Sequence, residues 1–152
     1  MIPLIRALAL GAASGARSSA GLAAVALTST PADHGAIAPR LGGRVGTAVT
    51  ALLAVGELVI DKLPATPSRL AVQGFVPRLV LGATAAGAQA GRAGRPVVVP
   101  ALVGAAGAAG FSYLGARFRA VAQKRFGSDR PGAIAEDVAA AALGYLGARR
   151  GS

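Results

Sequence analysis

The residues with the greatest capacity for chemistry are a few charged side chains that interrupt apolar stretches. Arg17, Glu57 and the Glu136-Asp137 pair each lie among Ala, Gly, Leu and Val residues. A charge inside a membrane-spanning helix costs roughly 2.5 to 3.5 kcal/mol on insertion scales unless a partner or water compensates it. We therefore expect these charges to meet in one buried cluster.

Two more charges extend this cluster. Glu57 and Asp61 are four residues apart, so they share a helix face and cannot both ionise cheaply unless Arg17 or Lys62 neutralises them. Arg17 lies 11 residues past Arg6, about 16 Å along a helix, which predicts a position near the bilayer centre. The pattern indicates a proton or cation relay, or an anion site at Arg17. A structural ion-pair network that fixes helix packing is the alternative.

The rest of the sequence lacks the residues that thiol, metal, nucleotide-binding or Ser-His-Asp chemistry requires. The chain has no cysteine and one histidine, His34, which we expect to be a solvated loop residue beside Asp33. It has no glycine loop ending in Gly-Lys-Ser or Gly-Lys-Thr and no Ser-His-Asp set. We therefore expect no catalytic residue, no metal site and no cofactor, and do not expect an enzyme.

Composition favours lipid as the solvent. The 152 residues are 53% hydrophobic and 14% charged, with a mean hydropathy of +0.56. The net charge of +10 comes from Arg and Lys residues that stand singly or in pairs without interleaved aromatics, which argues against nucleic-acid binding. An Ala-rich soluble or peripheral basic protein is the alternative to an integral membrane protein.

Proline, glycine and arginine divide the chain into five apolar stretches. The stretch from Val97 to Ala116 carries no charge. As a helix rising about 1.5 Å per residue, it is long enough to cross a hydrocarbon core of roughly 30 Å. We predict a single all-α integral membrane domain over residues 1–152, a polytopic helix bundle with about five spans. The predicted spans are 4–28, 45–61, 76–91, 97–116 and 131–148.

Small residues recur within these stretches at intervals that suit close helix packing in lipid. They predict helix contacts within the bundle and suggest a homo-oligomer. The glycines concerned are Gly11, Gly15, Gly42, Gly46, Gly87, Gly91, Gly104, Gly107 and Gly110.

An internal similarity suggests an inverted repeat. Gly11-Ala12-Ala13 matches Gly104-Ala105-Ala106, and each of these stretches precedes one with an acidic residue. If the first two stretches match the last two, the helix between them would invert the second pair, as in transporters. With five spans, nine basic residues fall on the side of the N-terminus and six on the other, so we expect a cytoplasmic N-terminus.

A longer pattern gives a resemblance. The segment Gly56-Glu57-Leu58-Val59-Ile60-Asp61-Lys62-Leu63-Pro64, with an earlier Gly15-Ala16-Arg17 and a later Glu136-Asp137, resembles a family of small bacterial multi-pass membrane proteins of unknown function. That family shares an E-L-V-x-D-K-x-P motif. Here Ser18 and Ser19 replace the bulky apolar residues that usually follow the arginine. The resemblance implies a bacterial inner membrane location and supplies no activity.

From the sequence we therefore expect a small transporter or channel-like protein with a buried charged cluster, open to proton coupling. Its partners would be the lipid bilayer and an unidentified small ion or solute. A non-catalytic membrane scaffold or assembly factor is the alternative.

Overall fold

The computed structural model describes residues 2–60, 71–127 and 130–150, and these are all-α, which confirms the all-α part of the predicted fold class. No strand occurs in these segments. The helices are α1 (Ile2–Ala16), α2 (Ala20–Thr28), α3 (Ala38–Leu41), α4 (Arg44–Ile60), α5 (Val72–Arg92), α6 (Val98–Phe126) and α7 (Arg130–Ala148).

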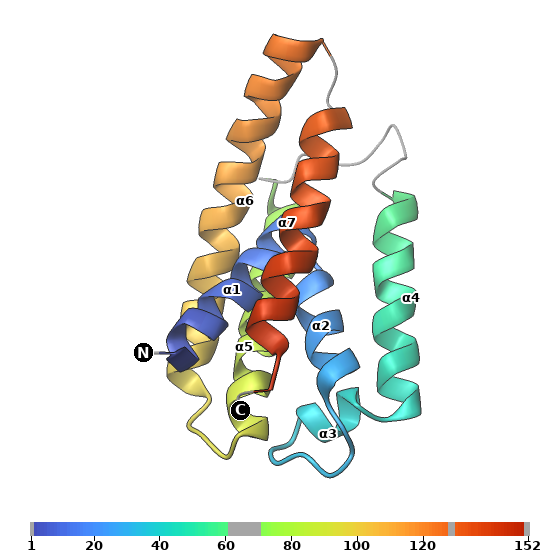
Figure 1. Ribbon diagram of the computed structural model, residues 1–152, viewed down its shortest axis with the longest axis vertical. Coiled ribbons are helices and arrows are strands. Elements are labelled where there is room, and N and C mark those ends of the chain that lie inside the picture. The colour runs from blue at the N-terminus through green and yellow to red at the C-terminus, as the bar shows by residue number, and fades with distance from the viewer. Residues whose placement is uncertain (1, 61–70, 128–129, 151–152) are drawn as a thin grey trace.

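The four longest helices run up and down the long axis of the molecule (Figure 1). Helices α4 and α6 run toward one end, and α5 and α7 return from it. The predicted stretch 76–91 lies within α5, which begins at Val72 and continues through Pro77. Pro77 lies in the second turn of this helix. The predicted stretch 97–116 lies in α6, which continues beyond it to Phe126.

The first predicted span is wrong as a single helix. Residues 4–28 form a helical hairpin, in which α1 rises and α2 descends (Figure 1). The chain reverses at Arg17–Ser19, and a Cβ at Gly21 would overlap the Leu10 carbonyl, so the two arms are closely packed. The arms are about 22 Å and about 13 Å long, and neither reaches across a core of roughly 30 Å. Arg17 consequently lies at the turn of the hairpin, not midway along a spanning helix.

Glycines let α1 lie against α6 at backbone distance. A Cβ at Gly11 would overlap the Gly104 carbonyl, and one at Gly107 would approach the Leu8 carbonyl to 2.7 Å. Gly15, Gly42 and Gly46 are similarly enclosed by neighbouring backbone. Six of the nine glycines singled out in the sequence thus have a packing role within the chain.

The other three glycines differ. A Cβ at Gly110 would meet no atom within 4 Å, and Cβ atoms at Gly87 and Gly91 would make only ordinary contacts. Packing within the chain does not explain glycine at these positions.

The expected inverted repeat does not fit the helix directions. Gly11 lies against Gly104, and Gly15 lies against Ala108, so α1 and α6 run parallel. An inverted repeat requires the matched elements to run in opposite directions. In addition, the first stretch is a hairpin, whereas the fourth is one helix.

Much of the apolar surface between the two ends of the bundle is exposed. Leu52 on α4, Leu102 on α6 and Tyr145 on α7 are each about two-thirds exposed or more. Among the described helices, one is both long and apolar enough to cross a membrane, over Val98–Arg125, and only 28% of its most apolar window is buried. The core helix of a soluble protein would be mostly buried.

The glycine contacts predict opposite effects for two alanine substitutions. Gly11→Ala should lower the free energy of unfolding by about 1 to 3 kcal/mol, because its methyl group meets the α6 backbone. Gly110→Ala, which faces open space, should be neutral or stabilise by up to about 1 kcal/mol through helix propensity. Thermal unfolding of both variants, followed by circular dichroism in one detergent, tests this. Equal destabilisation would contradict the assigned contact.

Candidate functional site

The turn of the hairpin holds the carboxylate of Glu57. The backbone amide of Ser18 donates to Oε1 at 2.7 Å, and the backbone amide of Ser19 donates to Oε2 at 3.0 Å. The Ser19 hydroxyl donates to the same Oε2 at 2.7 Å. Glu57 comes from α4, so three hydrogen bonds join two segments that are distant in sequence.

This arrangement follows from the needs of a helix N-terminus. The first amides of a helix have no acceptor within it, and the helix dipole favours negative charge there. Ser19 precedes α2 but makes no side-chain cap to it. Glu57 instead supplies the acceptor from another helix, and its negative charge lies where the dipole favours it.

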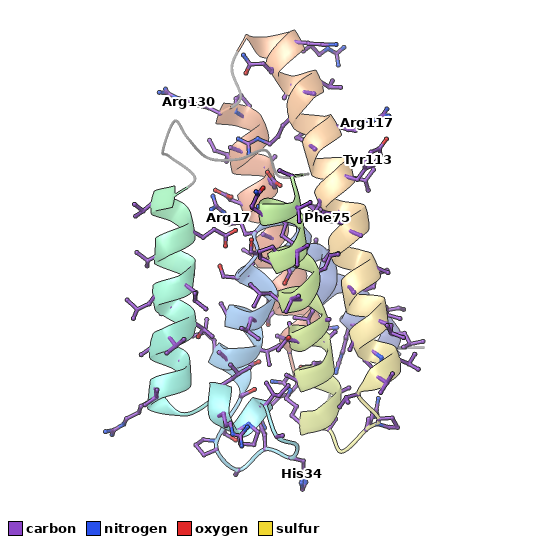
Figure 2. All side chains as sticks on the ribbon, turned by 180° about the vertical axis from the view of Figure 1, so that it is seen from behind. Arg17, His34, Phe75, Tyr113, Arg117 and Arg130 are labelled. Carbon is purple, nitrogen blue, oxygen red and sulfur yellow. The ribbon has the colours of Figure 1, made fainter. Side chains whose placement is uncertain are left out.

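Two arginines accompany this carboxylate. Arg78 on α5 is 4% exposed, and its Nη2 lies 3.9 Å from Glu57 Oε1. Its Nη1 donates to the Gly74 carbonyl at 2.6 Å. Arg17 Nε donates to Asp137 Oδ1 at 2.6 Å, which ties the hairpin turn to α7. Figure 2 shows Arg17 at the height of Phe75, near the beginning of α5.

Glu136, the neighbour of Asp137, faces α6. Its side chain is 4% exposed, and Oε2 lies 3.8 Å from Nη1 of Arg119. A Cβ at Gly115 would lie 3.0 Å from Glu136 Oε1. The absence of a side chain at Gly115 therefore makes room for the carboxylate.

We call these charged residues, together with the two serines of the turn, the apex cluster. It contains four of the six residues expected from the sequence, and Asp61 and Lys62 lie outside the described residues. Arg17 bonds Asp137, the neighbour of Glu136; its expected pairing with Glu57 or Glu136 stays a prediction. The members of the cluster are Arg17, Ser18, Ser19, Glu57, Arg78, Arg119, Glu136 and Asp137.

Sequence reasoning missed Arg78 and Arg119 because both were counted only as basic residues at or beyond the ends of spans. Ser18 and Ser19 were seen only as weakening the hydrophobicity of the first span. Two adjacent serines after an arginine, at the end of one apolar run and the start of another, are the signal that could have indicated a helix N-terminus.

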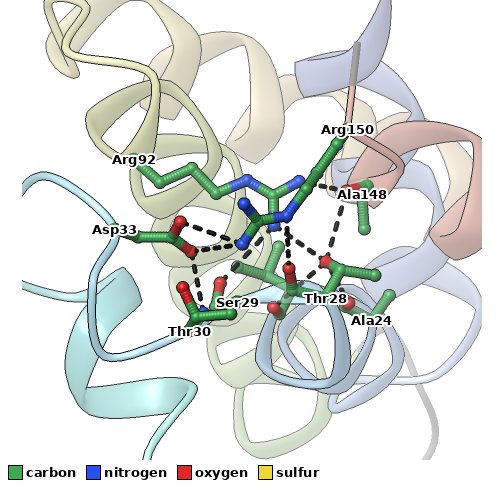
Figure 3. A network of polar contacts seen from close by, with 9 residues as sticks. Ala24, Thr28, Ser29, Thr30, Asp33, Arg92, Ala148 and Arg150 are labelled. Atoms are coloured by element: carbon green, nitrogen blue, oxygen red, sulfur yellow. Dashed lines mark hydrogen bonds and ion pairs between the residues drawn. The ribbon is translucent and has the colours of Figure 1, made fainter. Parts of the chain in front are cut away.

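A second polar network lies at the opposite end of the bundle (Figure 3). Arg92 at the end of α5 is 9% exposed, donates to the Thr28 hydroxyl at 2.8 Å and bonds the Ala148 carbonyl. Arg150 donates to the Thr28 carbonyl at 3.1 Å and to both carboxylate oxygens of Asp33, at 2.9 and 3.0 Å. We call this the base network. It joins the carboxyl ends of α2, α5 and α7.

Asp33 in the base network is held in its ionised form. Its partial burial favours the neutral acid, but the amide of Thr30, at 2.9 Å, and the guanidinium of Arg150 outweigh this and lower the pKa of Asp33. Because the pKa is lower in the folded state, ionised Asp33 stabilises the fold above its unfolded pKa. This stabilisation is lost as the pH falls through the folded value.

The charges of the described residues are sorted into these two ends. Arg78 and Arg92 on α5 are 14 residues apart, or about 21 Å, and no charge separates them. On α4, Arg44 and Glu57 are 13 residues apart, or about 20 Å, again without a charge between them. The bundle therefore has an uncharged middle layer, about 20 Å thick, between the apex cluster and the base network.

The described residues contain no group of three or more His, Asp or Glu side chains placed to hold a metal ion. The apex cluster alternates acidic and basic groups, and its contacts are hydrogen bonds and ion pairs. Such a site can bind, exchange or position a charged species.

No family model, curated protein or solved structure matches the chain.

The bonds to Glu57 predict a local change on neutralisation. In Glu57→Gln the Ser18 and Ser19 amides lose their ionised acceptor, a type of bond worth about 1.5 to 3 kcal/mol, so both should exchange hydrogen at least about tenfold faster. Residue-level hydrogen exchange measures this. Asp137→Asn is the control and should leave both amides protected. Unchanged exchange in Glu57→Gln would show that the carboxylate does not hold the turn.

The base network predicts unequal roles for its two arginines. Arg92→Met should lower the free energy of unfolding by about 1 to 3 kcal/mol, because buried acceptors lose their donor. Arg150→Met should cost at most about 1 kcal/mol, since the Arg150 side chain is 55% exposed. Denaturation of both variants in the same detergent makes the comparison. A larger loss of unfolding free energy in Arg150→Met than in Arg92→Met would contradict the unequal roles assigned to the two arginines.

Proposed function

We propose that this chain is an integral membrane protein that moves a small ion or solute past the apex cluster. In this proposal α4, α5, α6 and α7 cross the bilayer, and α1 and α2 form a re-entrant hairpin among them. The hairpin takes the place of the first of the five expected spans. The observation that carries the proposal is the hairpin turn itself, where backbone amides at a helix end meet a carboxylate from another helix.

The outer surface supports a bilayer as the surroundings. Leucine, valine and tyrosine side chains are exposed around the uncharged middle layer, and an apolar surface of that extent is unusual on a soluble monomer. The layer is thinner than the hydrocarbon core of a bilayer, but long arginine and lysine side chains at both ends can reach the interface.

The hairpin supports a role in transport. Backbone that leaves helical geometry inside a membrane is stable only where protein or water-filled cavities surround it. In many transporters such helix ends, with their free amides, bind the anionic groups of the substrate. The Ser18 and Ser19 amides form an end of this kind, and here the chain's own Glu57 occupies it.

The location we propose is a bacterial inner membrane, in line with the E-L-V-x-D-K-x-P resemblance. The cytoplasmic N-terminus expected from five spans no longer follows from the count of basic residues. The Arg6 carbonyl lies near Gly147, so Arg6 belongs to the base end. Seven of the described basic residues lie at each end, so those residues alone do not choose between the two orientations by the positive-inside rule.

A membrane scaffold is the second candidate. A Cβ at Gly110, an exposed residue of α6, would meet no atom within 4 Å, and small residues on lipid-facing helices favour association between chains. A scaffold would hold the apex cluster as a fixed ion-pair network and would move nothing.

Reconstitution in liposomes separates the two candidates. The wild type should carry a pH-dependent flux of protons or small ions, and Glu57→Gln should reduce that flux at least about tenfold, because the turn loses its charged acceptor. Asp33→Asn in the base network is the matched control and should retain flux. Absence of flux for every tested ion in correctly folded wild type would favour the scaffold.

A further inference from the structure

The cleft between α6 and α7 differs from the rest of the apex. It has a volume of about 250 Å³ and apolar walls, formed by Phe111, Leu114 and Phe118 of α6 and by Ala135 and Ala139 of α7. Leu114 and Phe118 are both more than half exposed, so the cleft opens sideways from the bundle. An apolar molecule could enter it directly from a lipid phase.

One charged group lines this cleft. Glu136 contributes to the wall, yet its side chain is only 4% exposed, so the carboxylate lies at the buried side of the cleft. Gly115 keeps the space beside Oε1 open, because a side chain there would approach that oxygen to 3.0 Å. A carboxylate buried in apolar surroundings is costly and gains strongly from a cation.

Arg119, a basic neighbour of Glu136, stands outside the cleft. Arg119 Nη1 is 3.8 Å from Oε2, beyond hydrogen-bonding distance, and the Arg119 side chain is 27% exposed. Arg119 is not part of the lining. A ligand inside the cleft would therefore meet the carboxylate first and could compete with Arg119 for it.

We infer that this cleft binds an organic cation with an apolar body, such as a substituted ammonium. The positive charge pairs with Glu136, and the body fills the apolar walls, which include the side chains of Phe111 and Phe118. This names a substrate class for the proposed transporter. It rests on that proposed function only for the claim that the bound cation is moved.

Binding to the purified protein in neutral detergent tests the site without any flux. Benzyltrimethylammonium is the probe, and neopentylbenzene, its uncharged isostere, is the control ligand. Amide shifts of residues 115 and 136 should report saturable binding of the cation and at least about tenfold weaker binding of the isostere. Equal affinities would overturn the inference, since the cleft would then be merely apolar.

Three variants test whether the cleft binds cations through Glu136. Glu136→Gln should weaken cation binding at least about tenfold, and Asp137→Asn, the neighbouring carboxylate, should leave it unchanged. Arg119→Gln should strengthen cation binding, because it removes the guanidinium that competes for the carboxylate. It also keeps the test decisive if Glu136→Gln fails to fold. Weaker cation binding in Arg119→Gln would show that Arg119 does not compete with the cation and would overturn the inference.

The binding measurement tests the cleft, and the flux measurement tests transport, so either proposal can be rejected without the other. Saturable cation binding without flux in liposomes would uphold the cleft and reject transport. Flux of other ions without cation binding would uphold transport and reject the cleft.

Discussion

The hydrogen bonds from the Ser18 and Ser19 amides to Glu57 hold the rest of the structure in place. They satisfy the two amides immediately before α2 and so allow the chain to reverse after α1. They also attach α4, which otherwise lies at the side of the bundle, to the hairpin (Figure 1). The Glu57 carboxylate thus both accepts hydrogen bonds from the amides that precede α2 and fixes α4 to the hairpin.

The reversal determines how charge is distributed. Because α1 rises and α2 returns, Arg6 and Asp33 lie at the base, whereas Arg17 lies at the apex with Glu57 and Asp137. The long helices follow the same pattern, and the uncharged layer between the two ends is about 20 Å thick. Burying ion pairs at both ends costs desolvation, which good geometry and additional hydrogen bonds offset.

Much of this could be predicted from residue types. Glycine spacing indicated close backbone contacts, and Gly11, Gly15 and Gly104 have them. Arg17, Glu57 and Glu136 lie at the same end of the bundle, as the cost of isolated charges in apolar stretches suggested. The positions of the last four long helices also follow from proline, glycine and arginine punctuation.

The hairpin could not be predicted in the same way. Residues 4–28 have the apolar content of one long helix, and Arg17-Ser18-Ser19 is too short a polar interruption to mark a reversal by itself. Its meaning depends on Glu57 and Asp137, which both lie far away in the sequence. Long-range partners of this kind leave no local pattern. Arg78 and Arg92 were missed for the same reason, since each is buried by contacts with distant segments.

If the chain spans a bilayer as proposed, the most direct test is the side of the bilayer on which each end of the hairpin lies. The chain has no cysteine, so Ile2→Cys, Ala32→Cys and Gln123→Cys would each carry a single thiol. In sealed vesicles with a membrane-impermeant maleimide, positions 2 and 32 should react from the same side and position 123 from the other. Reaction of positions 2 and 32 from opposite sides would mean that residues 4–28 cross as one span, and would contradict the hairpin.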